Sequence, residues 1–458
     1  MKDEIRLNRL LILVALLVFL HTVIRYFFSR GMFFDGVTYA AVSQHWSEGL
    51  GSTWQPHYHN RDYPFYAHPP LLYMMLGSLF RTLGNYWWVE NLYNALTFVA
   101  SISLSIALFR MVFPEYRNRF GFVLIGLAAL PIWAWSFRST MMENTVLVFS
   151  LSALCFLMLA RKRSIYWIMP AGFCIGLGMF TKGPVALFPL SFFLLYDISM
   201  HLFSWRTFYH SFLLLIIPAA MLGFVWIVWP DSHSFFNQYF HQQILGSLSG
   251  TDGRLSIFRK VVLELLPLLI TGVALWVLAR RKGTTLPTSR ILFLTFVGLS
   301  ASLPLLISGK QRAFYLMPSL TFFALSWAII ASIFLQNSML LIYKAHSKKM
   351  WFVVLMGLVL SKGWMICCLP AYNRDADIQH DVIRISEKVP HRSLIGCDSI
   401  TAVHWPTVAY FARYGQFTIS DVGEMEYYIS RHNPPESGWK KVAIGLRYFE
   451  LYQRHHDN

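Results

Sequence analysis

Residues 7–40 read LNRLLILVALLVFLHTVIRYFFSRGMFFDGVTYA, an apolar run followed by a short stretch that holds an isolated acid, Asp35. An apolar run of about 20 residues is long enough to cross the roughly 30 Å hydrocarbon core of a bilayer. Lys2, Arg6 and Arg9 precede the run, and positive residues favour the cytoplasmic side of a membrane. Because no polar cleavage region follows, we interpret this segment as an uncleaved anchor that leaves the cytoplasm.

The composition of the whole chain indicates a membrane protein. Of its 458 residues, 55% are hydrophobic, 17% are aromatic and only 14% are charged, which excludes an ordinary soluble domain. The formal net charge of +16 arises largely from short loops beside apolar runs. Such charges set the orientation in the membrane, so they require no nucleic-acid partner. The five cysteines show no metal-ligand spacing, and packing is their expected role.

The clusters of Lys and Arg divide the chain into a self-consistent series of membrane crossings. If every cluster is cytoplasmic, the chain crosses about eleven times and leaves its C-terminal tail outside the cytoplasm. The expected spans are 10–28, 89–109, 121–137, 144–160, 165–180, 185–198, 211–229, 261–279, 291–307, 313–333 and 351–368.

The apolar stretch Pro69–Leu83 does not fit this series as a further span. A crossing here would move the later positive loops to the other side, and the stretch is short and opens with two prolines. We therefore predict a half-embedded or interfacial helix. A short crossing with a compensating missed span is the main alternative.

The character of the sequence changes near Asn373, where polar residues become common. We predict two domains: a transmembrane domain over 1–370 and a small soluble α/β domain over 371–458 outside the cytoplasm. The fold class is thus a polytopic α-helical membrane protein with a small C-terminal α/β domain. In that domain the sequence predicts helices over 378–388 and 403–414 and strands near 393–397, 417–419 and 441–444.

Two groups in the first long extracytoplasmic loop are candidates for chemistry. Asp35 lies beside aromatic residues, where a carboxylate is partly desolvated and costly. It could cap a helix that starts at Gly36, or it could act as a general base on an acceptor hydroxyl. His68 precedes Pro69-Pro70, which would place it at a helix N-terminus, where anions are favoured; a solvated turn is the alternative.

Several cations also occur in short loops on the extracytoplasmic side, against the usual orientation bias. Any one of them could simply reach lipid headgroups. Several cations on one face with two acids fit recognition of a phosphate or pyrophosphate better. The cations are Arg138, Lys182, Arg254, Lys310 and Arg312, and the acids are Asp35 and Glu143.

Five short motifs follow one another along residues 1–370: Asp35, His68-Pro69-Pro70, Arg138…Glu143, Thr181-Lys182-Gly183-Pro184 and Lys310…Tyr315…Pro318. In this order they resemble the GT-C glycosyltransferases of the protein-mannosyltransferase superfamily, and most closely the aminoarabinose transferase-like branch that acts on lipid A. The chain departs from that family in having Asp35-Gly36 where Asp-Glu is common. The segment Tyr239–Gln243 is also more neutral than the His/Arg-rich segment of many relatives, and the C-terminal domain is shorter.

The resemblance implies a hexosyl- or pentosyltransferase that uses a sugar on a polyprenyl phosphate and acts on a lipid, glycan or protein acceptor. It places the enzyme in the cell inner membrane with an extracytoplasmic site and with membrane lipids as partners. Asp35 would be the base, and Glu143 would orient the acceptor or bind a divalent metal ion; no other cofactor is implied. The groups that would contact the donor phosphate or the acceptor are His68, Arg138, Lys182, Arg254, Lys310, Arg312 and Tyr315.

Elementary chemistry agrees with this expectation and leaves two alternatives. No nucleotide-sugar pool exists outside the cytoplasm, and the chain has no nucleotide-binding loop, so an activated sugar would arrive on a lipid. Direct displacement at the anomeric carbon predicts inversion. A transporter or flippase would instead place ionisable groups near the middle of its spans, and a non-catalytic assembly protein would not gather these motifs in one pocket.

Overall fold

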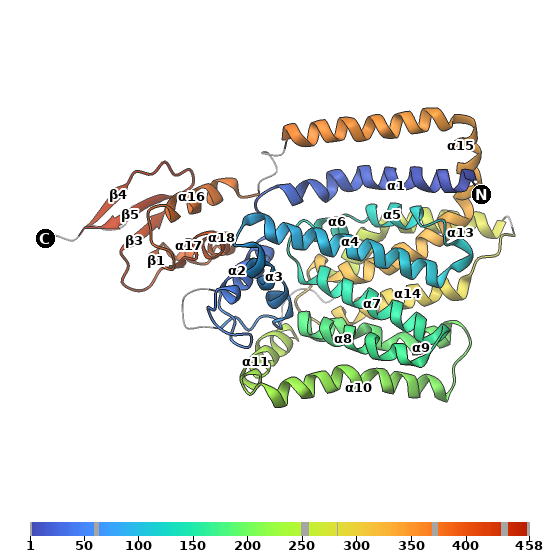
Figure 1. Cartoon of the computed structure of the whole chain (residues 1–458), viewed down its shortest axis with the longest axis horizontal. Coiled ribbons are helices and arrows are strands. Elements are labelled where there is room, and N and C mark those ends of the chain that lie inside the picture. The colour runs from blue at the N-terminus through green and yellow to red at the C-terminus, as the bar shows by residue number, and fades with distance from the viewer. Residues whose placement is uncertain are drawn as a thin grey trace.

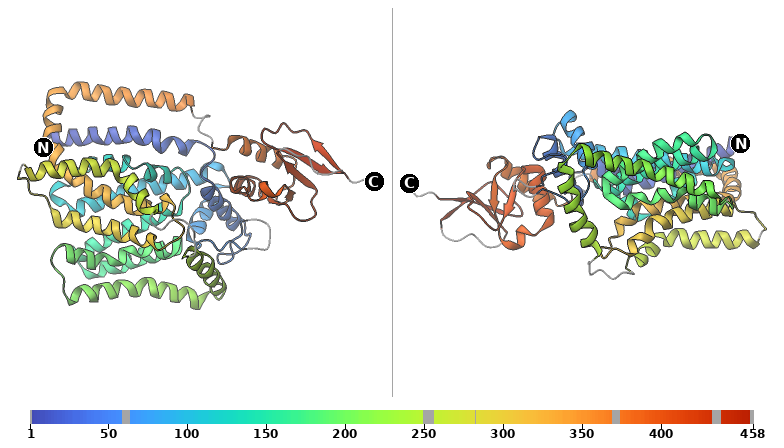
Figure 2. Two further views of the ribbon diagram at one scale, coloured as in Figure 1. Left: turned by 180° about the vertical axis from the view of Figure 1, so that it is seen from behind. Right: turned by 90° about the horizontal axis from the view of Figure 1, so that it is seen from below.

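A bundle of long helices carries a small mixed α/β domain at one end (Figure 1). The computed structural model describes residues 2–58, 64–248, 256–281, 283–368, 374–431 and 438–455. Both views in Figure 2 show the C-terminal domain extending away from the bundle along its long axis. We call this end of the bundle the domain end and the opposite end, near the N-terminus, the far end.

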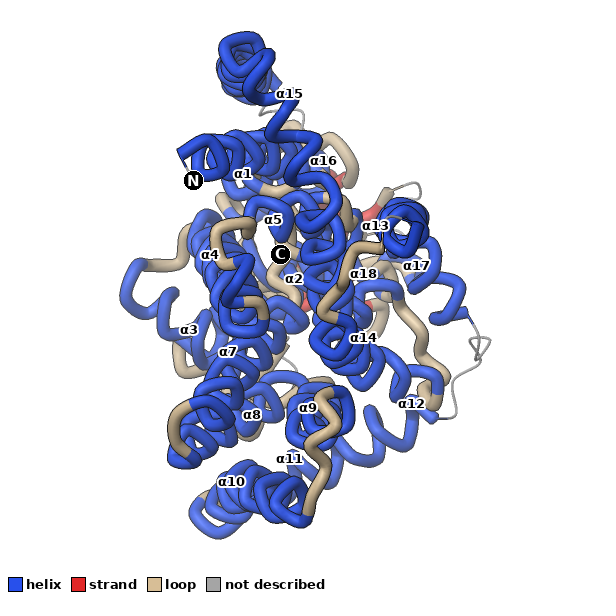
Figure 3. Tube along the Cα trace, turned by 90° about the vertical axis from the view of Figure 1, so that its right-hand side faces the viewer, coloured by secondary structure: helices blue, strands red, loops and turns tan. Residues whose placement is uncertain are grey.

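Eight helical segments of the described chain are long and apolar enough to cross a membrane, so the chain is a multi-pass membrane protein. Viewed along the bundle, α1 and α15 lie at one edge and α10 lies at the opposite edge (Figure 3). The longer helices of the bundle are α1 (Lys2–Thr22), α4 (Trp87–Val112), α7 (Met142–Lys162), α8 (Ile168–Lys182), α10 (Trp205–Val228), α13 (Ser256–Arg281), α14 (Thr288–Ser302) and α15 (Met317–Cys368).

One of these eight segments, Ile165–Ser199, is too long for one crossing and turns back. After α8, the 3₁₀ helix η4 (Gly183–Ser191) and then α9 (Phe192–Ser199) return to the far end. There Asp197 accepts a hydrogen bond from Arg161, which lies in the last turn of the preceding span. Two of the predicted spans, 165–180 and 185–198, therefore form a helical hairpin.

The long helix α15 makes a second reversal at His346, where the backbone leaves helical geometry. Its second half returns beside α1 along one edge of the bundle (Figure 1). Leu10 packs in the same apolar cluster as Val354, and His21 hydrogen-bonds to Ser361 at 2.7 Å. The helix thus contains two predicted spans, 313–333 and 351–368.

The predicted span 121–137 consists of two short helices, α5 (Gly121–Ala128) and α6 (Pro131–Ser136). The break falls immediately before Pro131, which cannot donate a backbone hydrogen bond and starts the second helix. With this segment and the two reversals, all eleven predicted spans lie in helical structure.

Shorter helices lie at the domain end, where α2 (Phe34–Ser47) and α3 (Leu71–Leu83) are side by side (Figure 1). A Cβ atom at Gly77 would lie 2.8 Å from the carbonyl oxygen of Ser43, so the glycine permits close packing of the two helices. With 13 residues, α3 is too short to cross a bilayer. This length favours the predicted interfacial helix over a further crossing. The other short elements that frame the site are α11 (Asp231–Tyr239), η5 (Phe240–Leu245), α12 (Gly246–Leu248), η6 (Leu303–Leu306) and η7 (Ala313–Leu316).

The C-terminal domain contains a five-stranded sheet with the order β2-β1-β3-β5-β4. β1 pairs in parallel with β2 and β3, whereas β5 is antiparallel to β3 and β4. The sequence analysis did not predict β3 and β5. The elements are α16 (Ala376–Ser386), β1 (Leu394–Gly396), α17 (Ser399–Ala402), α18 (Trp405–Tyr410), η9 (Phe411–Gly415), β2 (Thr418–Ser420), β3 (Tyr427–Ser430), β4 (Trp439–Val442) and β5 (Glu450–Arg454).

One apolar core joins the C-terminal domain to α2 and α3. Val37 and Leu72 from these helices belong to the same buried cluster as Val382, Phe411 and Leu451 from the C-terminal domain. The composition of the sequence changes near residue 370, but the residues before and after this point pack together in one apolar core. This shared core holds α2, the helix that carries Asp35.

Candidate active site at the domain end

A cavity of about 620 Å³ opens among the helices at the domain end. Segments from α7 to α15 form its walls, and several 3₁₀ turns contribute to them. Five of the predicted site residues line this one cavity, although they come from five different segments of the chain: His68, Glu143, Lys182, Lys310 and Tyr315.

An acid and a lysine form a buried ion pair in the cavity wall. Glu143 in the first turn of α7 accepts a hydrogen bond through Oε1 from the ammonium of Lys182 at the end of α8. Their side chains are 2% and 10% exposed. The other oxygen of Glu143 is buried and has no partner among the residues that the structure describes. Lys182 also lies 4.6 Å from the ring centroid of Tyr315, so its ammonium is held by a charge and a ring together.

The backbone turn after Lys182 accounts for its position. Gly183 has a φ angle of +77°, which residues with a side chain rarely adopt. The hydroxyl of Tyr239 donates a hydrogen bond to the carbonyl oxygen of Lys182 at 3.3 Å. A Cβ atom at Gly183 would lie 2.1 Å from that hydroxyl. Both the backbone and the packing of this turn therefore require glycine.

Asp35 lies in the first turn of α2. It is not among the residues that line the cavity, but the charges of this ion pair act on it. The helix begins before Asp35, and its cap residue Phe33 makes no side-chain cap hydrogen bond, so the predicted alternative of a cap at Asp35 is wrong. Burial raises the pKa of Asp35 to about 6, the charge of Glu143 adds to the rise, and Lys182 and Arg312 oppose it. A carboxylate with this pKa is ionised at neutral pH and remains basic enough to accept a proton.

The glycine that follows Asp35 explains why the chain departs from an Asp-Glu pair. A Cβ atom at Gly36 would lie 2.9 Å from both the backbone nitrogen of Thr140 and the sulfur of Met32. A glutamate at position 36 would therefore push α2 away from the turn before α7. The second acid of this site comes instead from that neighbouring segment, as Glu143.

His68 lines the cavity as a neutral group. Its ring packs edge-on against Tyr39, with 5.6 Å between the ring centroids. Burial, together with the positive charges of Lys182 and Lys310, lowers the pKa of His68 to about 3. At neutral pH the imidazole can donate or accept a hydrogen bond, but it carries no charge to offer a phosphate.

Two exposed cations, Lys310 in the cavity lining and Arg312 outside it, lie on either side of a buried glutamine. Gln311 accepts hydrogen bonds from the backbone of Ile257 at 2.8 Å and from the hydroxyl of Ser256 at 2.9 Å. This anchor holds the loop against the start of α13. Lys310 and Arg312 are exposed on both sides of it, and their charges act on His68 and Asp35, respectively.

Two of the predicted cations are not brought into this group. The guanidinium of Arg138 donates to the carbonyl oxygen of Thr22 at 2.6 Å and lies 4.4 Å from the ring centroid of Tyr26. Arg138 therefore ties the α6–α7 turn to the end of α1, and it is not part of the cavity lining. Arg254 falls outside the described residues.

Sequence reasoning missed three tyrosines around the acids. Tyr39 lies one helical turn after Asp35 on the same face of α2, and burial and the charge of Asp35 raise its pKa, so it remains a hydrogen-bond donor. The hydroxyl of Tyr73 is buried without a partner in the described chain. Tyr239 supports the Lys182 turn. Only the spacing of Asp35 and Tyr39 was a signal in the sequence.

The donor set does not fit a metal ion. Among the described residues, no group of three or more His, Cys, Asp or Glu side chains could hold one. One oxygen of Glu143, the residue proposed as a metal ligand, already accepts a hydrogen bond from Lys182, and a lysine is a poor neighbour for a divalent cation. We therefore derive no step through a metal.

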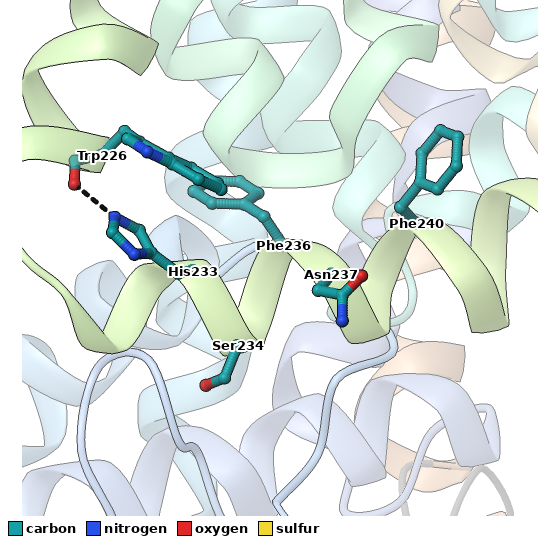
Figure 4. A pocket seen from close by; sticks show the side chains of 6 residues that line it. All are labelled: Trp226, His233, Ser234, Phe236, Asn237 and Phe240. Atoms are coloured by element: carbon teal, nitrogen blue, oxygen red, sulfur yellow. Dashed lines mark hydrogen bonds between the residues drawn. The ribbon is translucent and has the colours of Figure 1, made fainter.

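A second hollow of about 520 Å³ lies on another face of α11 (Figure 4). Trp226 and Phe236 lie nearly parallel there, and His233 hydrogen-bonds to the carbonyl oxygen of Trp226 at 2.7 Å. Its lining contains neither an acid nor a lysine or arginine, so it lacks the groups that a transfer reaction requires.

Solved structures with a similar fold include ArnT from Cupriavidus metallidurans, both bound to undecaprenyl phosphate and in the apo state. The TM-scores are 0.66 and 0.67, the identities 15% and 14%, and each match covers 97% of both chains. The chain has the GT-C fold. No protein-family model matches the sequence, and no curated protein matches it significantly.

Two further structures share the GT-C fold more distantly. AglB from Archaeoglobus fulgidus, in complex with an inhibitory peptide and a dolichol-phosphate, has a TM-score of 0.55 at 13% identity, covering 93% of this chain and 69% of that one. The arabinofuranosyltransferase AftD from Mycobacteria has a TM-score of 0.52 at 12% identity, covering 99% and 40%. The GT-C fold and the small C-terminal sheet domain confirm the predicted fold class.

Proposed function

We propose that this chain is a membrane glycosyltransferase that moves a sugar from a polyprenyl-phosphate donor to a lipid or glycan acceptor. The observation that supports this proposal is that the cavity has a charged region and a largely apolar wall. Glu143, Lys182 and Lys310 form a charged region, and the remaining wall is largely apolar, with residues such as Val185, Leu187, Phe188, Leu305 and Ile307. A donor with a charged sugar-phosphate head and a hydrocarbon tail matches both parts.

In the proposed reaction, the acceptor oxygen attacks the anomeric carbon of the donor sugar while Asp35 removes the proton of the acceptor hydroxyl. The bond between the anomeric carbon and the phosphate oxygen breaks, and the polyprenyl phosphate leaves with the bonding electrons. The new bond forms on the opposite face of the sugar, so the product is inverted. The pKa of Asp35, about 6, suits this transfer at neutral pH.

The cations provide the second requirement, which is stabilisation of the leaving phosphate. Lys182 is held in place by Glu143 and the ring of Tyr315. Lys310 also lines the cavity, and the charge of the exposed Arg312 acts on Asp35. Preorganised positive groups stabilise charge that develops in a transition state more than charge already present in the substrate. Glu143 acts here by orienting Lys182, and His68 offers a neutral hydrogen bond to the sugar or the acceptor.

The solved structures with the same fold suggest which classes of molecule could be the donor and the acceptor. One structure of ArnT is bound to undecaprenyl phosphate, and AglB was solved with a dolichol-phosphate. We extend this to a polyprenyl-phosphate-linked hexose or pentose as donor and to a cell-envelope glycolipid such as lipid A as acceptor. A protein acceptor is the second candidate, because AglB was solved with an inhibitory peptide.

The test is incubation of the purified protein with defined polyprenyl-phosphate sugars and with candidate lipid, glycan and peptide acceptors. Mass spectrometry should detect an acceptor that has gained one sugar, together with free polyprenyl phosphate. Anomeric analysis of the product should show inversion. A lack of transfer from every polyprenyl-phosphate donor would contradict the proposed function.

The alternative function is that of a transporter or flippase, which would also have many membrane spans. Such a protein places ionisable groups near the midplane of the bilayer, where they line a path. Here the acid–lysine pair and Lys310 line one cavity at the domain end, and the charges of the pair act on Asp35, the potential base. This arrangement favours group transfer.

The pH dependence of turnover should report the base. We expect kcat/KM to fall as the pH drops through about 6, because protonated Asp35 cannot accept the proton of the acceptor. Initial rates measured from pH 3.5 to 8 at subsaturating donor and acceptor would give this acidic limb. A limb near pH 4, the range of an ordinary carboxylate, would contradict the proposed role of Asp35.

We also propose that the protein lies in the cell inner membrane with the domain end outside the cytoplasm. Protease added to sealed, right-side-out spheroplasts should then cleave the C-terminal domain and spare the loop at Arg280–Lys282. The reason is the positive charge of that loop, which favours the cytoplasmic side. Protection of the domain together with cleavage of the loop would reverse the orientation.

A further inference from the structure

The C-terminal domain inserts one arginine among the helices of the domain end. Arg413 lies in η9, and its side chain is only 2% exposed. Its NH1 group donates to the side chains of Gln44 at 2.9 Å and Asn85 at 2.6 Å, and its NH2 group donates to Glu90 at 2.8 Å. The guanidinium also lies 4.6 Å from the ring centroid of Phe80.

The partners of Arg413 belong to three segments that the sequence keeps apart. Gln44 lies near the end of α2, Asn85 lies in the connection after α3, and Glu90 lies in the first turn of α4. A guanidinium has five donors in a rigid plane and can bridge all three at once. The same side chain therefore joins the C-terminal domain to the helix of Asp35 and to a membrane-spanning helix.

A second contact holds the other end of α2. The hydroxyl of Tyr410, three residues before Arg413, donates a hydrogen bond to the carbonyl oxygen of Met32 at 3.2 Å. Met32 lies three residues before Asp35, and Gln44 lies nine residues after it. The α18–η9 segment thus holds the chain on both sides of Asp35, through Met32 just before α2 and through Gln44 within it. These two contacts restrain α2 from shifting along its axis.

We propose that Arg413 is a positioning residue, through which the C-terminal domain holds Asp35 against Glu143 and Lys182. The role of Asp35 as a general base rests on the function proposed above. The position of Asp35 in the structure does not depend on that function. A misplacement of about 1 Å can lower the rate of an enzyme by ~10²-fold. The domain is accordingly part of the catalytic apparatus, although it contributes no group that touches the substrate.

The test removes the link without leaving a charge in the protein interior. Arg413→Met alone would leave Glu90 buried and unpaired, which is strongly destabilising. We therefore choose the double variant Arg413→Met/Glu90→Gln, and Arg413→Lys as the conservative variant. The matched control is Arg392→Gln, which removes an ion pair between the C-terminal domain and Glu48 just after α2. Because Arg392 and Glu48 are partly exposed, that pair contributes little to stability.

We expect the double variant to unfold near the wild-type temperature and to lose about 10-fold or more in kcat, with KM changed by less than about 2-fold, since geometry and not binding is lost. The acidic limb of its pH profile should lie below that of the wild type, because a displaced Asp35 is better hydrated. Arg413→Lys should recover part of kcat, and Arg392→Gln should behave as the wild type. A folded double variant with wild-type kcat and an unmoved acidic limb would overturn the proposal, as would a lower kcat without any shift of that limb.

A readout independent of turnover separates this proposal from the proposed function. Asp35→Cys introduces a thiol. Because the protein also has an exposed free cysteine, Cys367, alkylation by a charged maleimide is measured on the isolated peptide that contains position 35. We expect alkylation to be several-fold faster when Arg413→Met/Glu90→Gln is added and unchanged when Arg392→Gln is added, because only the first pair of substitutions releases α2. Equal rates in all three backgrounds would refute the positioning role, even if no sugar transfer were detected.

Discussion

Asp35→Asn should lower turnover by at least ~10²-fold, the usual scale for a lost general base, and should at the same time make the protein more stable. The native pKa of Asp35, about 6, lies above its ordinary value of 3.8, so at pH 7 the folded protein contains a carboxylate in an unfavourable environment. Asparagine has a similar shape and no charge. We expect a gain in the free energy of unfolding on the order of 1–3 kcal/mol at pH 7.

The sign of this effect can be checked by pH. A carboxyl group whose pKa is higher in the folded state makes the wild type lose stability as the pH rises from about 4 to 6. The difference in melting temperature between Asp35→Asn and the wild type should therefore be largest at pH 7 and vanish near pH 4. Asp231→Asn is a suitable control, because Asp231 is exposed on α11. Near-wild-type turnover in Asp35→Asn would refute the role as a base.

Lys182→Met should destabilise the protein by about 3–5 kcal/mol, because it leaves the buried charge of Glu143 without its partner. The double variant Lys182→Met/Glu143→Gln contains neither charge and should recover most of the stability. Turnover should remain at least ~10²-fold below that of the wild type in both variants, since the group proposed to stabilise the leaving phosphate is absent. Thermal unfolding in detergent and initial rates measure the two effects separately.

The control for this comparison is an ion pair on the surface. Lys441 pairs with Glu450 at the exposed edge of the C-terminal sheet, so Lys441→Met should change neither the melting temperature nor turnover. Recovery of turnover in Lys182→Met/Glu143→Gln would show that Lys182 serves folding alone. In that case the leaving phosphate would have to be stabilised by the two exposed cations, Lys310 and Arg312.

The sequence predicted the gathering of Glu143, Lys182 and Lys310 because topology alone requires it. Each lies in a turn between two spans, and alternate turns of an up-and-down bundle meet at the same end. The hydrophobic pattern and the positive loops therefore predicted that these residues lie on the same side of the membrane. The same argument gives no direction to a side chain, and Arg138 shows the consequence, because it lies in a turn on that side but binds Thr22.

Two properties of the site depend on three-dimensional packing and could not be predicted. His68 is neutral because it is buried and because two lysines distant in sequence lower its pKa. From the sequence alone, we expected His68 to lie at a helix N-terminus, where anions are favoured. The role of Arg413 depends on partners in α2 and α4, with a sequence separation of 323 residues from Glu90. No local spacing or periodicity encodes such a contact.

The contacts that the α18–η9 segment makes with α2 and with Met32 also imply an order of events during biosynthesis. Met32 and Tyr410 are separated by 378 residues, and Gln44 and Arg413 by 369. At 5–20 residues per second, ribosomes need on the order of tens of seconds to make the intervening chain. For that time the apolar face of α2, including Val37, lacks its final cover. The nascent protein therefore reaches the membrane with its first span and its acid already made, and it acquires a working geometry only when the α18–η9 segment arrives.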